Sequence, residues 1–163
     1  MVSTRKDRPL GATLILTLAT SVAAAAAPAP REDQFLIQGI VSGSQTVTPQ
    51  GTDTVRAEYS FNDRGRGDHI IATWKLDAAG VPTEYSGSGN DYVKAAVTET
   101  FRIANGKATW SNRAEHGEKV VTGEAFYVPA NPPPEFTAVL ARALLKAPGR
   151  KLPLLPEGEA LIA

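Results

Sequence analysis

The stretch Val55-Arg56-Ala57-Glu58-Tyr59-Ser60-Phe61 decides the fold class, because apolar and polar residues alternate through it without interruption. A period of two puts one set of side chains on each face of a strand, as a sheet with one buried and one solvated face requires. Similar segments, punctuated by Gly and Asn, continue to Val128 and predict a β-meander. This region contains no recognisable set of catalytic residues. Function therefore has to be inferred from the predicted cellular location of the protein and from its resemblance to known proteins.

Turn residues around this stretch set the expected strand boundaries. Asn105-Gly106 is the sharpest hairpin turn, because both central residues of a type I′ turn need positive φ. Gly87–Asn90 is expected to be a connection between strands. The pattern predicts a mainly antiparallel curved sheet or half-barrel of about seven or eight strands. The expected strands are Phe35–Val41, Gln45–Thr48, Thr54–Asn62, His69–Asp77, Val81–Ser86, a strand from about Tyr92 to Ile103, one around Ala108 and Trp110, and Glu118–Val128.

The period changes after the last predicted strand. Phe136, Val139, Leu140, Ala143 and Leu144 recur at the spacing of one helix face, which predicts an amphipathic α-helix over about residues 134–147 that covers the sheet. The segment after this helix is rich in Leu and Pro and ends in Glu159-Ala160-Leu161-Ile162-Ala163. This ending has two open interpretations, a strand that is cut off in the middle or an edge strand of the domain.

The N-terminus resembles an export signal in its layout. Arg5, Lys6 and Arg8 precede an apolar stretch from Leu10 to Val22, and small residues follow it. The apolar stretch is short for a membrane span, so we expect residues 1–27 to be a signal peptide cleaved within residues 23–26. An uncleaved anchor is the alternative. The predicted location is the periplasm or the outside of the cell, with a Pro-rich linker at 28–33, a single domain at 34–163 and no stable membrane anchor after cleavage.

Charge and cysteine content narrow the classes of partner. The chain has 17 basic and 17 acidic residues, and removal of residues 1–27 leaves 14 basic and 16 acidic ones. A net charge of −2 with scattered bases argues against a nucleic-acid partner. The chain has no Cys, so thiol chemistry and disulfides are excluded.

Residues able to carry catalysis are sparse. The two histidines, His69 and His116, form no His-x-His pair, and with Asp63, Asp68 and Glu115 they are interpreted as solvated loop residues. The run Ser86-Gly87-Ser88-Gly89-Asn90 lacks the glycine spacing of a nucleophile elbow. No residue pattern predicts a metal, a cofactor or a catalytic group.

Glu99 is the one residue that breaks the pattern. It occupies the apolar phase of a strand, so without a β-bulge its carboxylate would face the core and need a partner. Arg56, Lys75 or Trp110 on neighbouring strands are the expected partners, and a bulge that returns Glu99 to solvent is the alternative. A structural polar site formed by Glu99, Arg56 and Lys75 is favoured over catalysis, because no second acid or base is placed to work with Glu99.

Several segments, in their order and spacing, resemble the N-terminal β-rich region that precedes the catalytic barrel in exported bacterial amidohydrolases. The resemblance extends from about Gln34 to Ala163. The segments are Asn62–Gly67, Leu76–Thr83, Gly89–Ala95, Glu99–Phe101, Asn105–Ser111 and Ala141–Leu145.

The resemblance implies a function without implying a site. Family members bind metals through residues of a downstream barrel, and no position of this chain matches those ligands. We therefore expect a non-catalytic accessory domain, without a cofactor, whose partner is an amidohydrolase barrel in cis or in trans. The sequence also leaves open a stand-alone binding module that holds an apolar ligand in a cavity beneath the helix.

Overall fold

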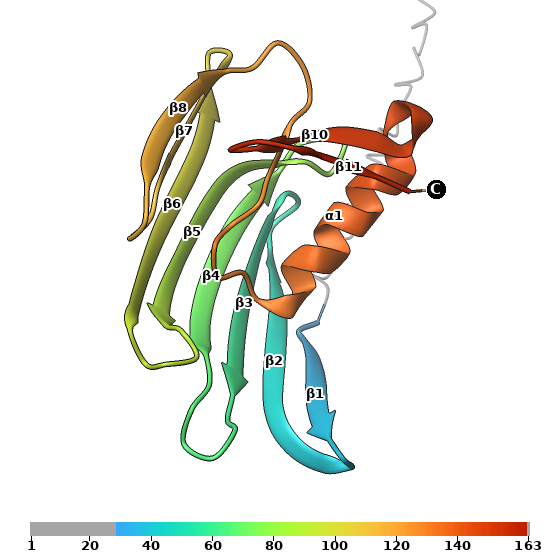
Figure 1. The fold of residues 1–163 in the computed structure, drawn as a ribbon. Coiled ribbons are helices and arrows are strands. Elements are labelled where there is room, and N and C mark those ends of the chain that lie inside the picture. Colours follow the sequence, from blue (N-terminus) through green and yellow to red (C-terminus); the bar gives the residue numbers. More distant parts are fainter. Residues whose placement is uncertain (1–28, 163) are drawn as a thin grey trace, which may run out of the picture.

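The computed structural model describes residues 29–162, and its main element is one antiparallel sheet of eight strands (Figure 1). Each strand pairs with its neighbours in sequence, so the sheet is a continuous meander with β1 and β8 at its open edges. The prediction of a mainly antiparallel curved sheet is confirmed. The strands are β1 (Arg31–Ile37), β2 (Ile40–Gln50), β3 (Thr54–Phe61), β4 (His69–Leu76), β5 (Pro82–Asn90), β6 (Ala96–Ala104), β7 (Lys107–Ser111) and β8 (His116–Val120).

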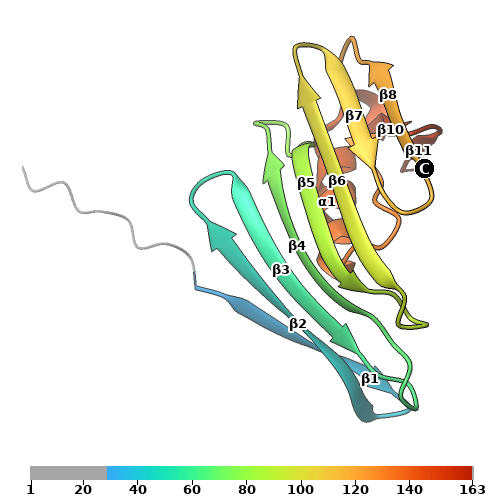
Figure 2. The same ribbon diagram turned by 90° about the vertical axis from the view of Figure 1, so that its left-hand side faces the viewer.

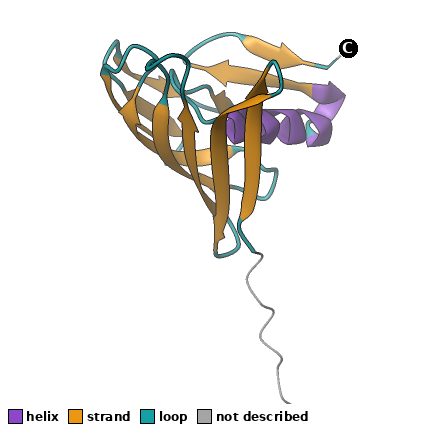
Figure 3. Ribbon diagram, turned by 90° about the horizontal axis from the view of Figure 1, so that it is seen from below, coloured by secondary structure: helices purple, strands orange, loops and turns teal. Residues whose placement is uncertain are grey.

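One helix and a small second sheet pack against the inner face of the large sheet. The helix α1 (Pro134–Lys146) lies in the curve of the sheet, as predicted (Figures 2 and 3). A short 3-10 turn, η1 (Pro148–Arg150), leads from it into the second sheet. That sheet has the order β11-β10-β9, with β10 parallel to β9 and antiparallel to β11. Its strands are β9 (Phe126–Tyr127), β10 (Lys151–Leu155) and β11 (Glu159–Leu161).

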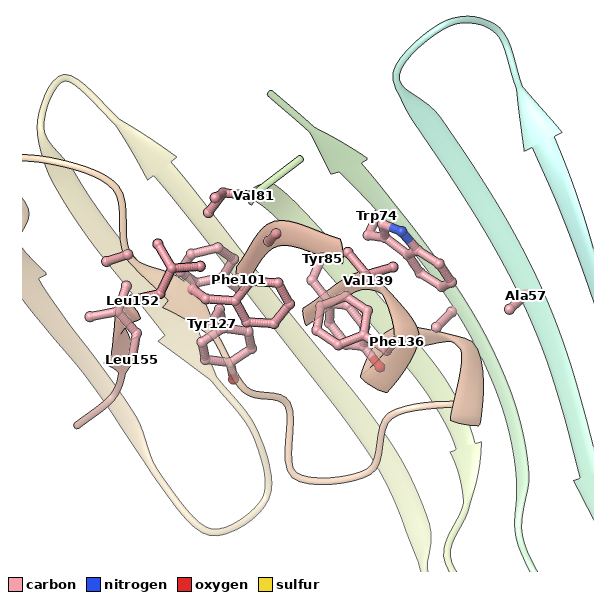
Figure 4. Packing of buried hydrophobic residues seen from close by; sticks show 14 of the residues in the cluster. Ala57, Trp74, Val81, Tyr85, Phe101, Tyr127, Phe136, Val139, Leu152 and Leu155 are labelled. Atoms are coloured by element: carbon pink, nitrogen blue, oxygen red, sulfur yellow. The ribbon is translucent and has the colours of Figure 1, made fainter. Parts of the chain in front are cut away.

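Aromatic side chains fill the space between the helix and the sheet (Figure 4). Trp74 meets Phe136 of α1 edge to face, with ring centroids 5.3 Å apart. Phe101 and Tyr127 stack in parallel at 4.2 Å. Both contacts join the sheet to segments that follow it in sequence, so the core depends on the whole described chain.

Several strand boundaries on the large sheet differ from expectation. The expected strand Phe35–Val41 is divided by a turn at Gln38-Gly39, where both residues take positive φ, and β2 replaces the expected shorter strand Gln45–Thr48. β1 begins at Arg31, within the segment expected to be a linker, and Asp33 of this strand accepts a hydrogen bond from Gln45 Nε2 of β2 at 3.1 Å. β5 continues to Asn90 through the expected connection at Gly87–Asn90. Gly89 permits this, because its φ is +139° and a Cβ there would lie 1.8 Å from the backbone oxygen of His69.

The expected strand Glu118–Val128 is wrong, because the chain divides it between two layers. β8 ends at Val120, and the exposed residues Thr122, Gly123 and Glu124 carry the chain to the small sheet. Phe126 and Tyr127 are both buried, which a strand alternating between core and solvent would not allow. Asn105 and Gly106, by contrast, take positive φ values of 52° and 74° at the predicted hairpin turn.

Residues 1–28 lie outside the described part of the chain, and the predicted signal peptide falls among them. Among the helices that the structure describes, none is both long and apolar enough to cross a bilayer.

Candidate functional site

Glu99 faces the core from the inner side of β6 and is only 1% exposed. Its Oε1 accepts a hydrogen bond from the Tyr127 hydroxyl at 2.7 Å and another from the backbone N–H of Ala130 at 2.9 Å. The pairing of β6 with β5 continues in unbroken register past Glu99, so no bulge turns the residue outward. The carboxylate therefore joins the sheet to the segment that crosses from β9 to the helix.

A second tyrosine hydroxyl belongs to the same buried layer. Gly87 lies opposite Glu99 in the register, and a Cβ on it would come within 2.9 Å of the Tyr85 hydroxyl. Among the described residues, the Tyr85 hydroxyl has no hydrogen-bond partner. Burial, and then the nearby charge of Glu99, raise the pKa of Tyr85. Burial raises the pKa of Tyr127 as well, and the hydrogen bond to Glu99 adds to this effect.

Arg56 and Lys75 are not partners of Glu99. Each lies next to a buried residue on its strand and so projects from the outer face of the sheet, where it pairs locally. Arg56 donates to Glu58 at 3.1 Å, and Lys75 lies 3.4 Å from Asp53. Trp110, the third expected partner, has an indole N–H without a hydrogen-bond partner in the described chain.

The surroundings of Glu99 favour anchoring over proton transfer. The carboxylate forms part of the wall of a pocket of about 120 Å³, which also includes Asn112, Arg113 and Asn131. Oε1 already accepts two hydrogen bonds, and Oε2 faces the same Ala130 N–H at 3.1 Å. With both oxygens held and the side chain almost fully buried, the arrangement fixes the chain around residue 130.

A second polar network, which the sequence did not reveal, holds the helix N-terminus. Glu135 is 6% exposed and forms ion pairs with Arg31 of β1 and with Arg142, the latter at 2.6 Å. The backbone N–H of Glu135 donates to Gln45 Oε1 at 2.9 Å. These contacts connect α1 to the first two strands. Because Arg31 pairs with Glu135, they also explain why β1 begins as early as Arg31.

The loop residues considered for chemistry do not assemble into a site. Asp63 accepts a hydrogen bond from the Tyr92 hydroxyl at 3.0 Å and lies 3.8 Å from Arg64. Within residues 29–162, no three His, Asp or Glu side chains are grouped so that they could hold a metal ion.

The space beneath the helix is occupied by side chains. Trp74, Tyr85, Phe101 and Phe136 are each at most 3% exposed there, and this gives no support to a cavity for an apolar ligand (Figure 4). A trough of about 440 Å³ lies instead on the outer face of the sheet. The exposed or half-buried residues that line it are Thr54, Thr73, Lys75, Glu84, Ser86, Thr100, Arg102, Thr109, Trp110 and Ser111.

The small sheet has an open edge at β11. This strand pairs with β10, and it has no strand on its other side in the described chain. Leu161 is 61% exposed, whereas Ile162 is partly buried against the core. The last described strand is therefore anchored to the domain and still presents one side to a partner.

Comparisons with models of protein families, with curated proteins and with solved structures find no match for this chain.

Proposed function

We propose that this chain is an exported accessory β domain of an amidohydrolase-like system and that it acts by docking rather than by catalysis. The partner in this proposal is the metal-dependent barrel implied by the sequence resemblance. The domain contributes the edge strand β11, and the chemistry belongs to the barrel.

The open edge of β11 carries the proposal. Leu154 N donates to Gly158 O at 2.9 Å, and Ile162 N donates to Arg150 O at 3.0 Å, so residues 158 and 162 face β10. By the two-residue period of a strand, the N–H of Leu161 points away from β10. An added strand can accept this hydrogen bond and cover the exposed Leu161 side chain.

The positions of the resembling segments support a shared scaffold. Asn62–Gly67, Asp77–Gly80 and Asn105–Gly106 lie at turns of the meander, and Glu99 and Phe101 lie in the core. These segments determine how the sheet bends and packs, and they do not surround a common pocket. The resemblance therefore supports a common fold for the accessory domain, and the activity is assigned to the barrel.

The proposal is tested first by reading the genomic DNA on the 3′ side of the Ala163 codon. We expect a barrel with a His-x-His motif, in frame or in the adjacent gene. That barrel is then produced separately, and its affinity for the purified chain is measured by calorimetry.

Variants of exposed leucines make the binding test specific. Leu161→Pro removes the outward N–H and obstructs strand addition, so it should weaken binding by about tenfold or more, since one hydrogen bond contributes about 1 kcal/mol and strand approach is also blocked. Leu145→Ser is the matched control, because Leu145 is also 61% exposed but lies on the helix. Its affinity should equal that of the unchanged chain.

Two results would contradict the proposal. One is an affinity for the barrel that Leu161→Pro leaves unchanged. The other is hydrolysis of amide or ester substrates by the purified chain alone when Zn²⁺ is added, because the active residues would then lie in this chain.

A further inference from the structure

The hairpin of β1 and β2 ends in four exposed aliphatic side chains. Leu36, Ile37, Ile40 and Val41, here called the aliphatic tip, are between 42% and 71% exposed. They form two cross-strand pairs, Leu36 with Val41 and Ile37 with Ile40. The tip lies at the end of the sheet that is remote from the helix and the small sheet (Figures 1 and 2).

The aliphatic tip lacks the charges that usually protect an exposed hairpin at a sheet edge. No Asp, Glu, Lys or Arg occurs between Asp33 and Asp53, a stretch that includes the tip and all of β2. Natural edge strands are commonly guarded by charged side chains, Pro or bulges against contact with other molecules. A hairpin tip without charged side chains can enter an apolar environment at a lower desolvation cost than a charged one.

Two neighbouring loops are fixed beside the aliphatic tip. The backbone N–H of Asn62 donates to Ser42 O of β2 at 2.8 Å, and Gly67 N donates to Tyr92 O at 2.9 Å. The loops at residues 62–68 and 91–95 therefore belong to the same rim as the tip. Val93, in the second loop, is 68% exposed and adds another aliphatic side chain.

The rim also presents cations. The Arg64 side chain is 96% exposed, and Arg66 is exposed and forms no ion pair with another described residue. The main acidic groups are already engaged, since Asp63 is bound by the Tyr92 hydroxyl and Asp91 lies 3.0 Å from Arg113. The charges of the two loops sum to zero, from Arg64, Arg66 and Lys94 against Asp63, Asp68 and Asp91, so the attraction for anions comes from the exposure of Arg64 and Arg66 and not from a net charge.

We propose that this rim docks onto an anionic lipid surface, with the aliphatic tip inserted among the acyl chains and Arg64 and Arg66 at the headgroups. Interfacial segments combine apolar side chains with Arg or Lys in this way. The apolar groups stand on projecting turns, which suit insertion into a fluid surface, whereas docking on a protein would require a matching groove. The inference is independent of the proposed docking through β11.

The absence of Cys makes a position-specific test possible in the full chain. A polarity-sensitive fluorescent dye is attached to Ile40→Cys, and to Leu145→Cys and Val120→Cys as controls, since residues 145 and 120 are 61% and 75% exposed elsewhere on the fold. Vesicles of phosphatidylcholine, alone or with an equal amount of phosphatidylglycerol, are then added. We expect a blue shift for Ile40→Cys with the anionic vesicles and none for the controls.

The arginines are tested with the same labelled chain. Arg64→Gln and Arg66→Gln should each weaken binding to anionic vesicles by about fivefold, the effect of one basic residue near such a surface. Circular dichroism verifies that every variant keeps its fold.

Three outcomes would overturn the proposal. The first is no shift at Ile40→Cys with either type of vesicle. The second is an equal shift at all three positions, which would indicate adsorption through another part of the chain. The third is a shift that grows with protein concentration in the absence of vesicles, which would make the tip a contact between copies of the chain.

Discussion

The substitution Tyr127→Phe should destabilise the domain by about 1.5–3 kcal/mol, the usual contribution of a hydrogen bond to a charged group. The Tyr127 hydroxyl donates to the Glu99 carboxylate at 2.7 Å in the buried layer. Phe keeps the ring, including its parallel stacking on Phe101 at 4.2 Å, so the loss is confined to the hydroxyl. Glu99 would then retain the Ala130 N–H as its remaining donor.

Tyr85→Phe is the matched control, because it makes the same chemical change in the same layer. The Tyr85 hydroxyl is buried without a hydrogen-bond partner in the described chain, so its removal eliminates a desolvation cost and breaks no bond. We expect stability to be unchanged or raised by up to about 1 kcal/mol.

Urea unfolding at neutral pH, followed by circular dichroism, measures both variants against the unchanged chain. A double-mutant cycle with Glu99→Gln isolates the pair, and Tyr127→Phe should cost at least about 1 kcal/mol less in that background. An equal loss of stability in the two Tyr→Phe variants, or a neutral Tyr127→Phe, would show that the hydrogen bond to Glu99 does not stabilise the domain.

Three further predictions follow from the same contacts. First, because the pKa values of Tyr85 and Tyr127 are raised above 10.0, the unfolded chain releases these protons first, and stability that is complete below pH 10 should fall as pH rises. Each of these two tyrosines contributes a slope that approaches about 1.4 kcal/mol per pH unit, so the alkaline unfolding curve of either Tyr→Phe variant should be shallower by about that amount. Second, Glu135→Gln should cost about 2–3 kcal/mol in thermal or urea unfolding, because it weakens ion pairs of a carboxylate that is 6% exposed. The exposed Lys151–Glu159 pair is the comparison, and Glu159→Gln should cost under about 1 kcal/mol; equal losses would contradict this. Third, Gly89→Ala should cost more than about 3 kcal/mol, since its Cβ would overlap the His69 oxygen, whereas Gly51→Ala, with open space around it, should cost about 1 kcal/mol. A comparable loss at the two glycines would show that β5 does not approach β4 as described.

The meander and the helix could be predicted because their determinants are local. Alternation around Ala57, the Asn105-Gly106 turn and the apolar stripe from Phe136 to Leu144 each depend on a few neighbouring residues. The division of Glu118–Val128 between two sheets could not be predicted in the same way. It depends on β10, which follows β9 by more than twenty residues and pairs with it in parallel.

In the polar site, too, local positions could be predicted from the sequence but contacts with distant segments could not. The inward position of Glu99 follows from its phase, and the outward positions of Arg56 and Lys75 could have been deduced from the buried Ala57 and Trp74 beside them. The partner Tyr127 could not be deduced, because it comes from the crossing segment and not from a neighbouring strand. The network around Glu135 is similar, since it joins residues more than a hundred positions apart.

Amide hydrogen exchange at Leu161 tests the proposed docking most directly. In the chain alone, the outward N–H of Leu161 should exchange rapidly, while that of Ile162, bonded to Arg150 O at 3.0 Å, should be slower. On addition of the barrel protein, the N–H of Leu161 should be strongly protected, with little change at Leu145 on the helix. Rapid exchange of Leu161 in a mixture that has demonstrably formed a complex would show that β11 is not the docking edge.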